Sequence, residues 1–193
     1  MATQIGVLTP TLQTFLESWK SVCDGDAVPK RAAIRPDIFP RQSLGYITYQ
    51  EYEAPGVLVW KIAGTALVDA IGMELTGSNA LDLVPVDERD YDMMTIEAAL
   101  AHPCGMIYAI ASRSTYGEPV VNRLLQLPVR GADGTISRFV GMVEPYALAE
   151  NGPTIELGER SMRRGQGALV DIGFGVPDME VVLGEWTKKH AMS

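Results

Sequence analysis

The amino-acid sequence predicts an α+β domain in which a five-stranded antiparallel sheet carries helices on one face, with an amphipathic helix near each end of the chain. Two strand-like segments precede a helical region, and three strand-like segments follow it with only short links between them. Such links force antiparallel pairing, because a parallel pair needs a crossover of about a dozen residues or more. A chain of 193 residues with 47% hydrophobic residues suits one domain with its own core.

The first predicted element is a helix over residues 10–22. Its apolar side chains recur with helical spacing on one face, and they are Leu12, Phe15, Leu16, Trp19 and Val22. Thr9 can cap this helix, and Pro10 suits its first turn. The following connector, punctuated by Pro29, Pro36 and Pro40, is expected to run over the surface.

A hairpin is predicted next, from strands at residues 44–53 and 56–63 and the turn Glu53-Ala54-Pro55-Gly56. In the second strand Leu58, Trp60 and Ile62 are expected to share a face. At Gly64-Thr65 the apolar period changes from two to 3.6, which predicts a short helix with Thr65 as N-cap. A longer helix over residues 87–101 follows, and His102-Pro103 ends it.

Three further strands are predicted at residues 105–115, 118–129 and 135–148, the last two joined by the turn Gly131-Ala132-Asp133-Gly134. The tail ends in a helix over residues 177–190. Its apolar stripe consists of Met179, Val182, Leu183 and Trp186. Gly165-Gln166-Gly167 and Gly173-Phe174-Gly175 are interpreted as loop glycines, since no dinucleotide-binding βαβ unit surrounds them.

The charge balance argues against two classes of partner. With 16 basic and 24 acidic residues the net charge is −8, which repels nucleic acid and anionic membranes. No segment approaches the ~18 apolar residues of a membrane span, and the N-terminus lacks the features of a signal peptide. The two cysteines, Cys23 and Cys104, form neither a disulfide framework nor a zinc motif, so a cytoplasmic location is expected.

Several motifs, in this order, resemble the PAS sensor domains, and within them the short, mostly stand-alone bacterial PAS proteins. The motifs are Arg35-Pro36-Asp37-Ile38, Ile62-Ala63-Gly64-Thr65, Gly72-Met73-Glu74-Leu75-Thr76-Gly77, Leu124-Leu125-Gln126-Leu127-Pro128-Val129 and Asp133-Gly134. The resemblance covers residues 12–148. It implies a five-stranded sheet curved over helices, a core cavity that can hold a small ligand, and dimer formation through the N-terminal helix.

The expected pocket lies where the sheet meets the helices. One strand is expected to contribute Leu58, Trp60 and Ile62, and Thr65 adjoins them. The next strand contributes either Met106, Tyr108 and Ile110 or their alternates, since its register is open. The polar groups best able to orient a ligand are Tyr108, Arg113 and Arg123, and the arginines would favour an anion. The alternative is that both arginines face water on the outer side of the sheet.

No catalytic or metal-binding residues are predicted, and the cofactor is left open. The Asn-Cys-Arg motif of flavin-adduct photosensors does not surround either cysteine. His102 lies near the position of a haem ligand in haem-binding PAS domains, but a histidine at a helix end is more often explained by the helix dipole. The acidic run at residues 86–92 is best interpreted as a solvated helix N-terminus.

The sequence is divided into an N-terminal helix and connector (residues 1–30), a PAS-like sensor domain (31–148) and a C-terminal extension (149–193). We expect a non-enzymatic module that binds a small ligand in its core, signals through protein association, or does both. The surface for a second copy or a signalling partner is assigned to Phe15, Leu16, Trp19, Leu183 and Trp186. The alternatives are a cone-shaped α+β isomerase or dehydratase acting on a small apolar substrate, and a structural domain with a filled core.

Overall fold

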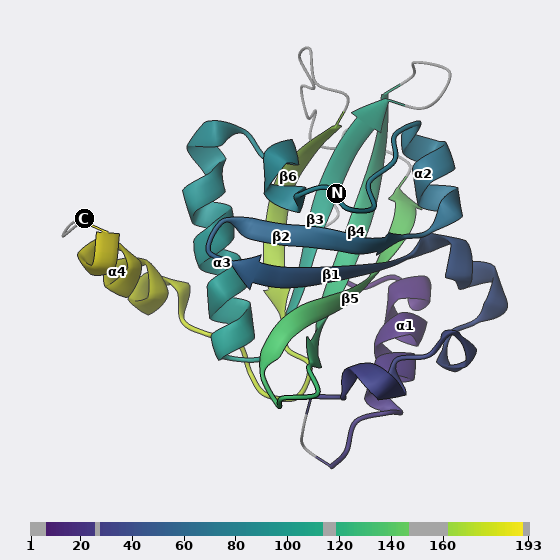
Figure 1. The fold of residues 1–193 in the computed structure, drawn as a ribbon, viewed down its shortest axis with the longest axis horizontal. Coiled ribbons are helices and arrows are strands. Elements are labelled where there is room, and N and C mark those ends of the chain that lie inside the picture. The colour runs from purple at the N-terminus through teal and green to yellow at the C-terminus, as the bar shows by residue number, and fades with distance from the viewer. Residues whose placement is uncertain (1–6, 26–27, 114–118, 147–161, 191–193) are drawn as a thin grey trace.

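The computed structural model describes residues 7–25, 28–113, 119–146 and 162–190. Its strands form one antiparallel sheet in the order β2-β1-β5-β4-β3-β6 (Figure 1). The strands are β1 (Ile47–Ala54), β2 (Val57–Ala63), β3 (Gly105–Arg113), β4 (Pro119–Arg130), β5 (Ile136–Tyr146) and β6 (Met162–Val170). The helices are α1 (Pro10–Lys20), α2 (Thr65–Ile71), α3 (Arg89–Ala101) and α4 (Met179–His190).

Within the described residues the sheet has six strands, not the predicted five, because β6 pairs antiparallel with β3 along its edge. The interpretation of Gly165-Gln166-Gly167 as loop glycines was therefore wrong, since these residues lie within β6. A Cβ atom at Gly167 would lie 3.1 Å from both the Ile107 carbonyl oxygen and the Tyr108 Cβ. Glycine allows this close approach of the two strands.

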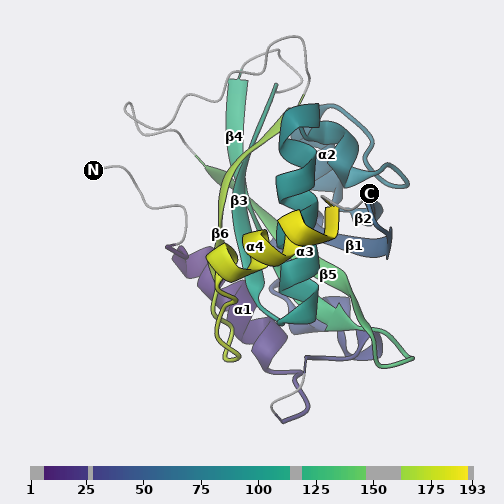
Figure 2. The same ribbon diagram turned by 90° about the vertical axis from the view of Figure 1, so that its left-hand side faces the viewer.

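Both faces of the sheet are covered, as Figure 2 shows almost edge-on. The face that meets α2 and α3, here called the inner face, packs the β3 residues Met106, Tyr108 and Ile110 against those helices and their connecting segments. The opposite, outer face packs Leu125 and Leu127 of β4 against α1. Strand alternation produces this division, because successive side chains point to opposite faces.

Helix α1 forms as predicted, with Thr9 as N-cap, but its apolar stripe is core. Phe15, Leu16 and Trp19 are at most 4% exposed, and the Trp19 indole donates a hydrogen bond of 3.0 Å to the Pro128 carbonyl. The assignment of these three side chains to a partner surface is therefore corrected. They cannot serve as a surface here because the chain's own sheet covers them.

The start of α2 differs from the prediction by one residue. Gly64 is the N-cap, and Thr65 is the first helical residue and is exposed. A Cβ atom at Gly64 would lie 2.2 Å from the Gly45 carbonyl oxygen, so only glycine fits where the chain leaves β2. The helix ends at Gly72, whose φ of 69° is the left-handed conformation that glycine adopts readily.

A β-bulge changes the facing of β2. Gln50 pairs with Trp60 while the preceding Tyr49 pairs with Ile62, so Lys61 is an extra residue on β2. Leu58 and Trp60 remain on the inner face and are buried, whereas Ile62 is 47% exposed. The expectation that Ile62 shares their face was wrong, because the bulge breaks the alternation between positions 60 and 62.

Helix α4 lies across α3 and extends away from the sheet (Figures 1 and 2). Asp178 caps it, since its carboxylate accepts a hydrogen bond of 2.9 Å from the Glu180 backbone N–H. Leu183 is 50% exposed and Trp186 is half-buried. The assignment of these two residues to a partner surface stays a prediction.

Candidate functional site

A small cavity lies on the inner face, between the sheet and the turn that precedes α3. Its volume is about 20 Å³, which is room for about one water molecule. The turn Ala80–Leu83 closes it on one side. The residues that line it are Leu58, Trp60, Ala80, Leu81, Leu83, Tyr108 and Ile110.

The structure brings three of the predicted pocket residues together, namely Leu58, Trp60 and Tyr108. It also resolves the open register of β3, since Met106, Tyr108 and Ile110 face α2 and α3, whereas the alternate Ile107 packs with α1 on the outer face. Ile62 and Thr65 lie outside this group, because the bulge turns the first outward and the start of α2 leaves the second exposed. The cavity wall is therefore largely apolar.

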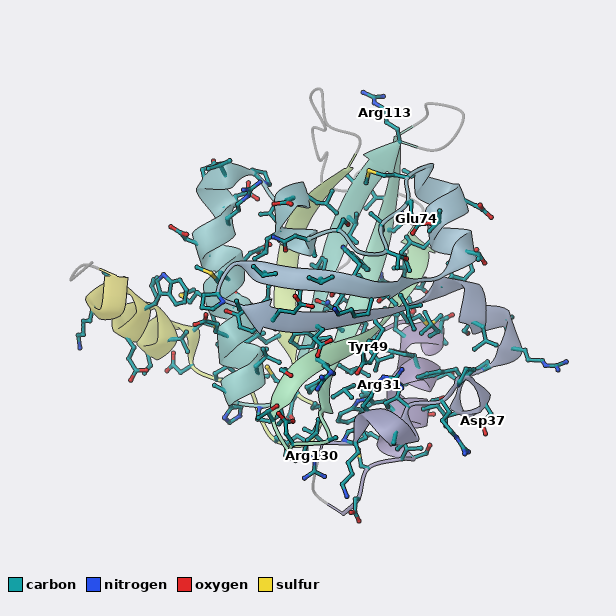
Figure 3. The ribbon with its side chains drawn as sticks, viewed as in Figure 1. Arg31, Asp37, Tyr49, Glu74, Arg113 and Arg130 are labelled. Atoms are coloured by element: carbon teal, nitrogen blue, oxygen red, sulfur yellow. The ribbon has the colours of Figure 1, made fainter. Side chains whose placement is uncertain are left out.

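Neither predicted arginine reaches the cavity. Arg113 is exposed at the end of β3 and points away from the body of the protein (Figure 3). Arg123 is only 2% exposed, but it lies on the outer face, where its guanidinium forms a 2.8 Å ion pair with Glu144 and donates to the Val7 carbonyl. The idea that these arginines orient an anionic ligand in the pocket is corrected. The alternative, in which both arginines face water on the outer side of the sheet, is also wrong for Arg123. This side chain lies on the outer face but is buried, and it contacts Val7.

A second arginine on the outer face, Arg31, contacts an aromatic ring. The Arg31 guanidinium lies 4.7 Å from the centre of the Tyr49 ring, and both residues are labelled in Figure 3. Burial raises the pKa of the Tyr49 hydroxyl to about 12, although the positive charges of Arg31 and Arg138 oppose this. Tyr49 therefore stays neutral at physiological pH, and its ring serves as packing surface for the connector that carries Arg31.

Two glutamines on the inner face were missed by the sequence analysis. Gln50 and Gln126 are fully buried, and the Gln126 side-chain amide donates a hydrogen bond to the Gln50 side-chain oxygen. The bond leaves the Gln50 Nε2 and the Gln126 Oε1 without a hydrogen-bond partner in the described part of the chain. The sequence feature that could have indicated a buried Gln126 is its amide within the otherwise apolar run Leu124-Leu125-Gln126-Leu127.

Two polar atoms near the glutamines on this face also lack a partner among the described residues, namely Thr48 Oγ1 and Trp60 Nε1, and Asn122 Nδ2 lacks one further along β4. Strand pairing brings the first two atoms close to the glutamines, because Trp60 lies opposite Gln50 and Gly141 lies between Thr48 and Gln126. A Cβ atom at Gly141 would lie 2.5 Å from Thr48 Oγ1, so the glycine leaves room for the Thr48 hydroxyl between the two strands. We call Thr48, Gln50, Trp60 and Gln126 the polar cluster.

The cysteines and His102 have local structural explanations. Burial, with a smaller effect of the Asp171 charge, raises the pKa of the Cys104 thiol to about 11, which suppresses the reactive thiolate. His102 is exposed, and one of its ring nitrogens lies 2.9 Å from the Phe174 carbonyl oxygen. Among the described residues, His, Cys, Asp and Glu form no group of three or more that could hold a metal ion.

The fold and the inner-face site define a domain in which a curved antiparallel sheet and short helices surround a small apolar core cavity. Residues 7–144 match a family model described as PAS domain. The chain therefore belongs to the PAS domain family, whose members are typically sensory signalling modules. This confirms the resemblance to PAS domains found in the sequence and the predicted fold class, with one strand more than expected among the described residues.

Solved structures that the chain matches include light-oxygen-voltage (LOV) domains. The chain is 21% identical to a structure described as an RsLOV d2 variant, covering 72% of this chain and 70% of that one with a TM-score of 0.42. The Rhodobacter sphaeroides LOV protein gives 19% identity, the same coverage and a TM-score of 0.43. The Vibrio cholerae VqmA dimer gives 14% identity, covers 53% of this chain and 46% of that one, and has a TM-score of 0.40. All three TM-scores lie below 0.5, so the assignment to the PAS domain family rests on the family model alone.

Comparison of the sequence with curated proteins finds no match. Within the described ranges, none of the helices is long and apolar enough to span a lipid bilayer.

Proposed function

We propose that this PAS domain is a sensory module that binds a small molecule on the inner face of its sheet and signals by a change in protein association. The observation that carries the proposal is the buried polar cluster, which meets the apolar cavity at Trp60. Binding, without a catalytic step of its own, is the function that this arrangement supports best.

The energetics of the polar cluster favour a bound partner. An unsatisfied buried donor or acceptor costs about 1–3 kcal/mol, and native proteins pair the great majority of theirs. Four such atoms on one face therefore form an expensive arrangement unless a ligand or ordered water pairs with them. The neighbouring walls from Leu58 and Ile110 would hold the apolar part of such a ligand.

The chemistry of the polar cluster, which shares Trp60 with the cavity wall, favours binding over proton transfer. A cone-fold isomerase or dehydratase needs a carboxylate or imidazole directed into its cavity. The polar cluster instead consists of two amides, a hydroxyl and an indole, and none of these groups titrates near neutral pH. A sensory role therefore fits these residues better than the enzymatic alternative.

Ligand access would require movement of the cavity's cover. Asn79 ties the turn Ala80–Leu83 to β2, because its side chain accepts from the Leu58 N–H at 3.0 Å and donates to the Gly56 carbonyl at 2.9 Å. A ligand larger than one water must displace this turn or repack the side chains below it. Such a displacement is a population shift between closed and open covers, in which the ligand favours the open one.

The output is proposed to be homodimer formation or binding of a signalling protein through α4. Val181 and Leu183 of this helix are 57% and 50% exposed, so the apolar surface that association would bury is present. Because α4 lies across α3, a shift of the elements over the inner face would change the surface that α4 presents.

Native mass spectrometry beside a denatured control tests the proposal. A non-covalent adduct of roughly a few hundred daltons, lost on denaturation, would support ligand binding and give the ligand class. The same spectra report monomer and dimer before and after ligand addition. A clean protein mass together with an oligomeric state that no candidate ligand changes would overturn the proposal in favour of a domain with a filled core.

A further inference from the structure

Building on the proposed function, we propose that the polar cluster recognises a neutral, planar, single-ring molecule with a lactam-type edge, in which an N–H donor lies beside a carbonyl acceptor. The two glutamines supply the matching pair, since Gln50 Nε2 is a donor and Gln126 Oε1 an acceptor, and both atoms are buried and unpaired within the described residues.

The donor and acceptor pattern does not depend on how the amides are oriented. Rotating both side-chain amides by half a turn exchanges their oxygen and nitrogen positions. The bond between them then runs from Gln50 to Gln126, and the pair still leaves one donor and one acceptor. A ligand must therefore offer one acceptor and one donor side by side, which is the edge of a cis-amide in a ring.

Trp60 and Thr48, the other two members of the polar cluster, can add hydrogen bonds to the carbonyl group of the ligand. Trp60 lies opposite Gln50 across β1 and β2, and its indole N–H is a second buried donor. Thr48 Oγ1 is close to the position that a Cβ on Gly141 would occupy, and its hydroxyl can donate or accept. In the amide orientation of this structure, in which Gln126 donates to Gln50, a ligand carbonyl oxygen with its two lone pairs can accept from both Gln50 and Trp60.

Charge and size narrow the ligand further. The side chains of the polar cluster and of the cavity wall carry no formal charge, and an ion buried against them would lack a counter-ion. The cavity holds about one water, so a single ring demands far less displacement of Leu81 and Ile110 than a fused ring system would. Tyr108 and Trp60 offer flat aromatic surface for such a ring.

Binding of matched probes tests this assignment. The probe is 2-pyridone, and its controls are N-methyl-2-pyridone, which lacks the donor, benzene, which lacks both polar groups, and benzoate, which is charged. The readout is the indole N–H resonance of Trp60 in the ¹⁵N-labelled chain of residues 1–193, identified with the Trp60→Phe variant. We expect 2-pyridone to shift this resonance to saturation and to bind at least about tenfold more tightly than each control, because each control leaves buried polar atoms unpaired.

A pair of variants separates recognition from folding. Replacing both glutamines, Gln50→Leu with Gln126→Leu, removes the buried amides together, so the protein is expected to keep or raise its melting temperature while losing 2-pyridone binding. The exposed Gln13→Leu variant is the matched control and is expected to bind normally. Gln126→Leu alone leaves the Gln50 amide unpaired and should weaken binding with some loss of stability.

The outcomes distinguish this inference from the proposed function. Equal binding of 2-pyridone and benzene, or tighter binding of benzoate, would overturn the lactam assignment while leaving an inner-face pocket in place. Undiminished 2-pyridone binding by the folded double-leucine variant would overturn it as well, since the ligand would then bind elsewhere. If no probe binds and native mass spectrometry shows a clean mass, both the assignment and the proposed function fail.

Discussion

Removing the negative charge of Glu144 should destabilise the fold strongly, although this residue lies far from the inner face. The Thr9 hydroxyl donates one hydrogen bond shared by the two Glu144 carboxylate oxygens, at 2.8 and 2.9 Å, and Glu144 pairs with Arg123 at 2.8 Å. Arg123 is 2% exposed and the Glu144 side chain 15%. The ion pair therefore attaches the start of α1 to β4 and β5 across the outer face.

The magnitude follows from the burial of Arg123. Breaking a buried ion pair by removing one partner costs about 3–5 kcal/mol, because the remaining charge is left uncompensated. Glu144 keeps some contact with solvent and Arg123 keeps its bond to the Val7 carbonyl, so we expect about 3 kcal/mol for Glu144→Gln. For a chain of this size 1 kcal/mol lowers the melting temperature by about 2–4 °C, which gives a fall of about 6–12 °C.

Thermal and urea unfolding of four proteins test this reasoning: the parent, Glu144→Gln, Arg123→Met, and the double variant Arg123→Met with Glu144→Leu. Each single variant should lose more stability than the double variant, because the double variant leaves no buried charge unpaired. A melting temperature of Glu144→Gln within about 1 °C of the parent would refute the argument, as would a double variant whose loss equals the sum of the single losses.

Three further predictions concern single positions. Gly64→Ala should destabilise by at least about 2 kcal/mol in urea unfolding, because its Cβ would lie 2.2 Å from a backbone carbonyl oxygen, whereas Gly184→Ala, with nothing within 4 Å of the added Cβ, should stabilise α4 by about 0.5–1 kcal/mol. Iodoacetamide near pH 8 should alkylate the partly exposed Cys23 well before the buried Cys104, whose pKa is about 11, and equal rates by mass spectrometry would contradict this. Hydrogen bonds from two backbone N–H groups lower the pKa of Asp171 below its ordinary 3.8, so its stabilisation is complete above that pH and is lost as the pH falls below it; Asp171→Asn should therefore flatten the fall in melting temperature between about pH 5 and about pH 2.

The sequence predicted those elements whose local chemistry is unambiguous. Thr9 and Pro10 marked the start of α1, and the turn at residues 131–134 joined β4 to β5. The face of the sheet on which Ile62 lies could not be predicted from the local sequence. It depends on the bulge at Lys61, and this bulge arises from the pairing of β2 with β1. Strand β6 was missed for a similar reason, because its glycines suggested a loop, and the close contact with β3 that favours glycine at position 167 is visible only once the two strands pair.

The polar cluster escaped prediction because β4 is buried on both of its faces. A strand with one wet face alternates between apolar and polar residues, and that alternation reveals its register. In β4 the residues facing α1, such as Leu125 and Leu127, are as buried as Leu124 on the inner face, so the run reads as continuously apolar. Within such a run the facing of Gln126 depends on where α1 packs, and this contact lies more than a hundred positions away in the sequence. The same packing buries the apolar stripe of α1 against the outer face. From the sequence alone this stripe suggested a partner surface, because the sheet that covers it could not be seen.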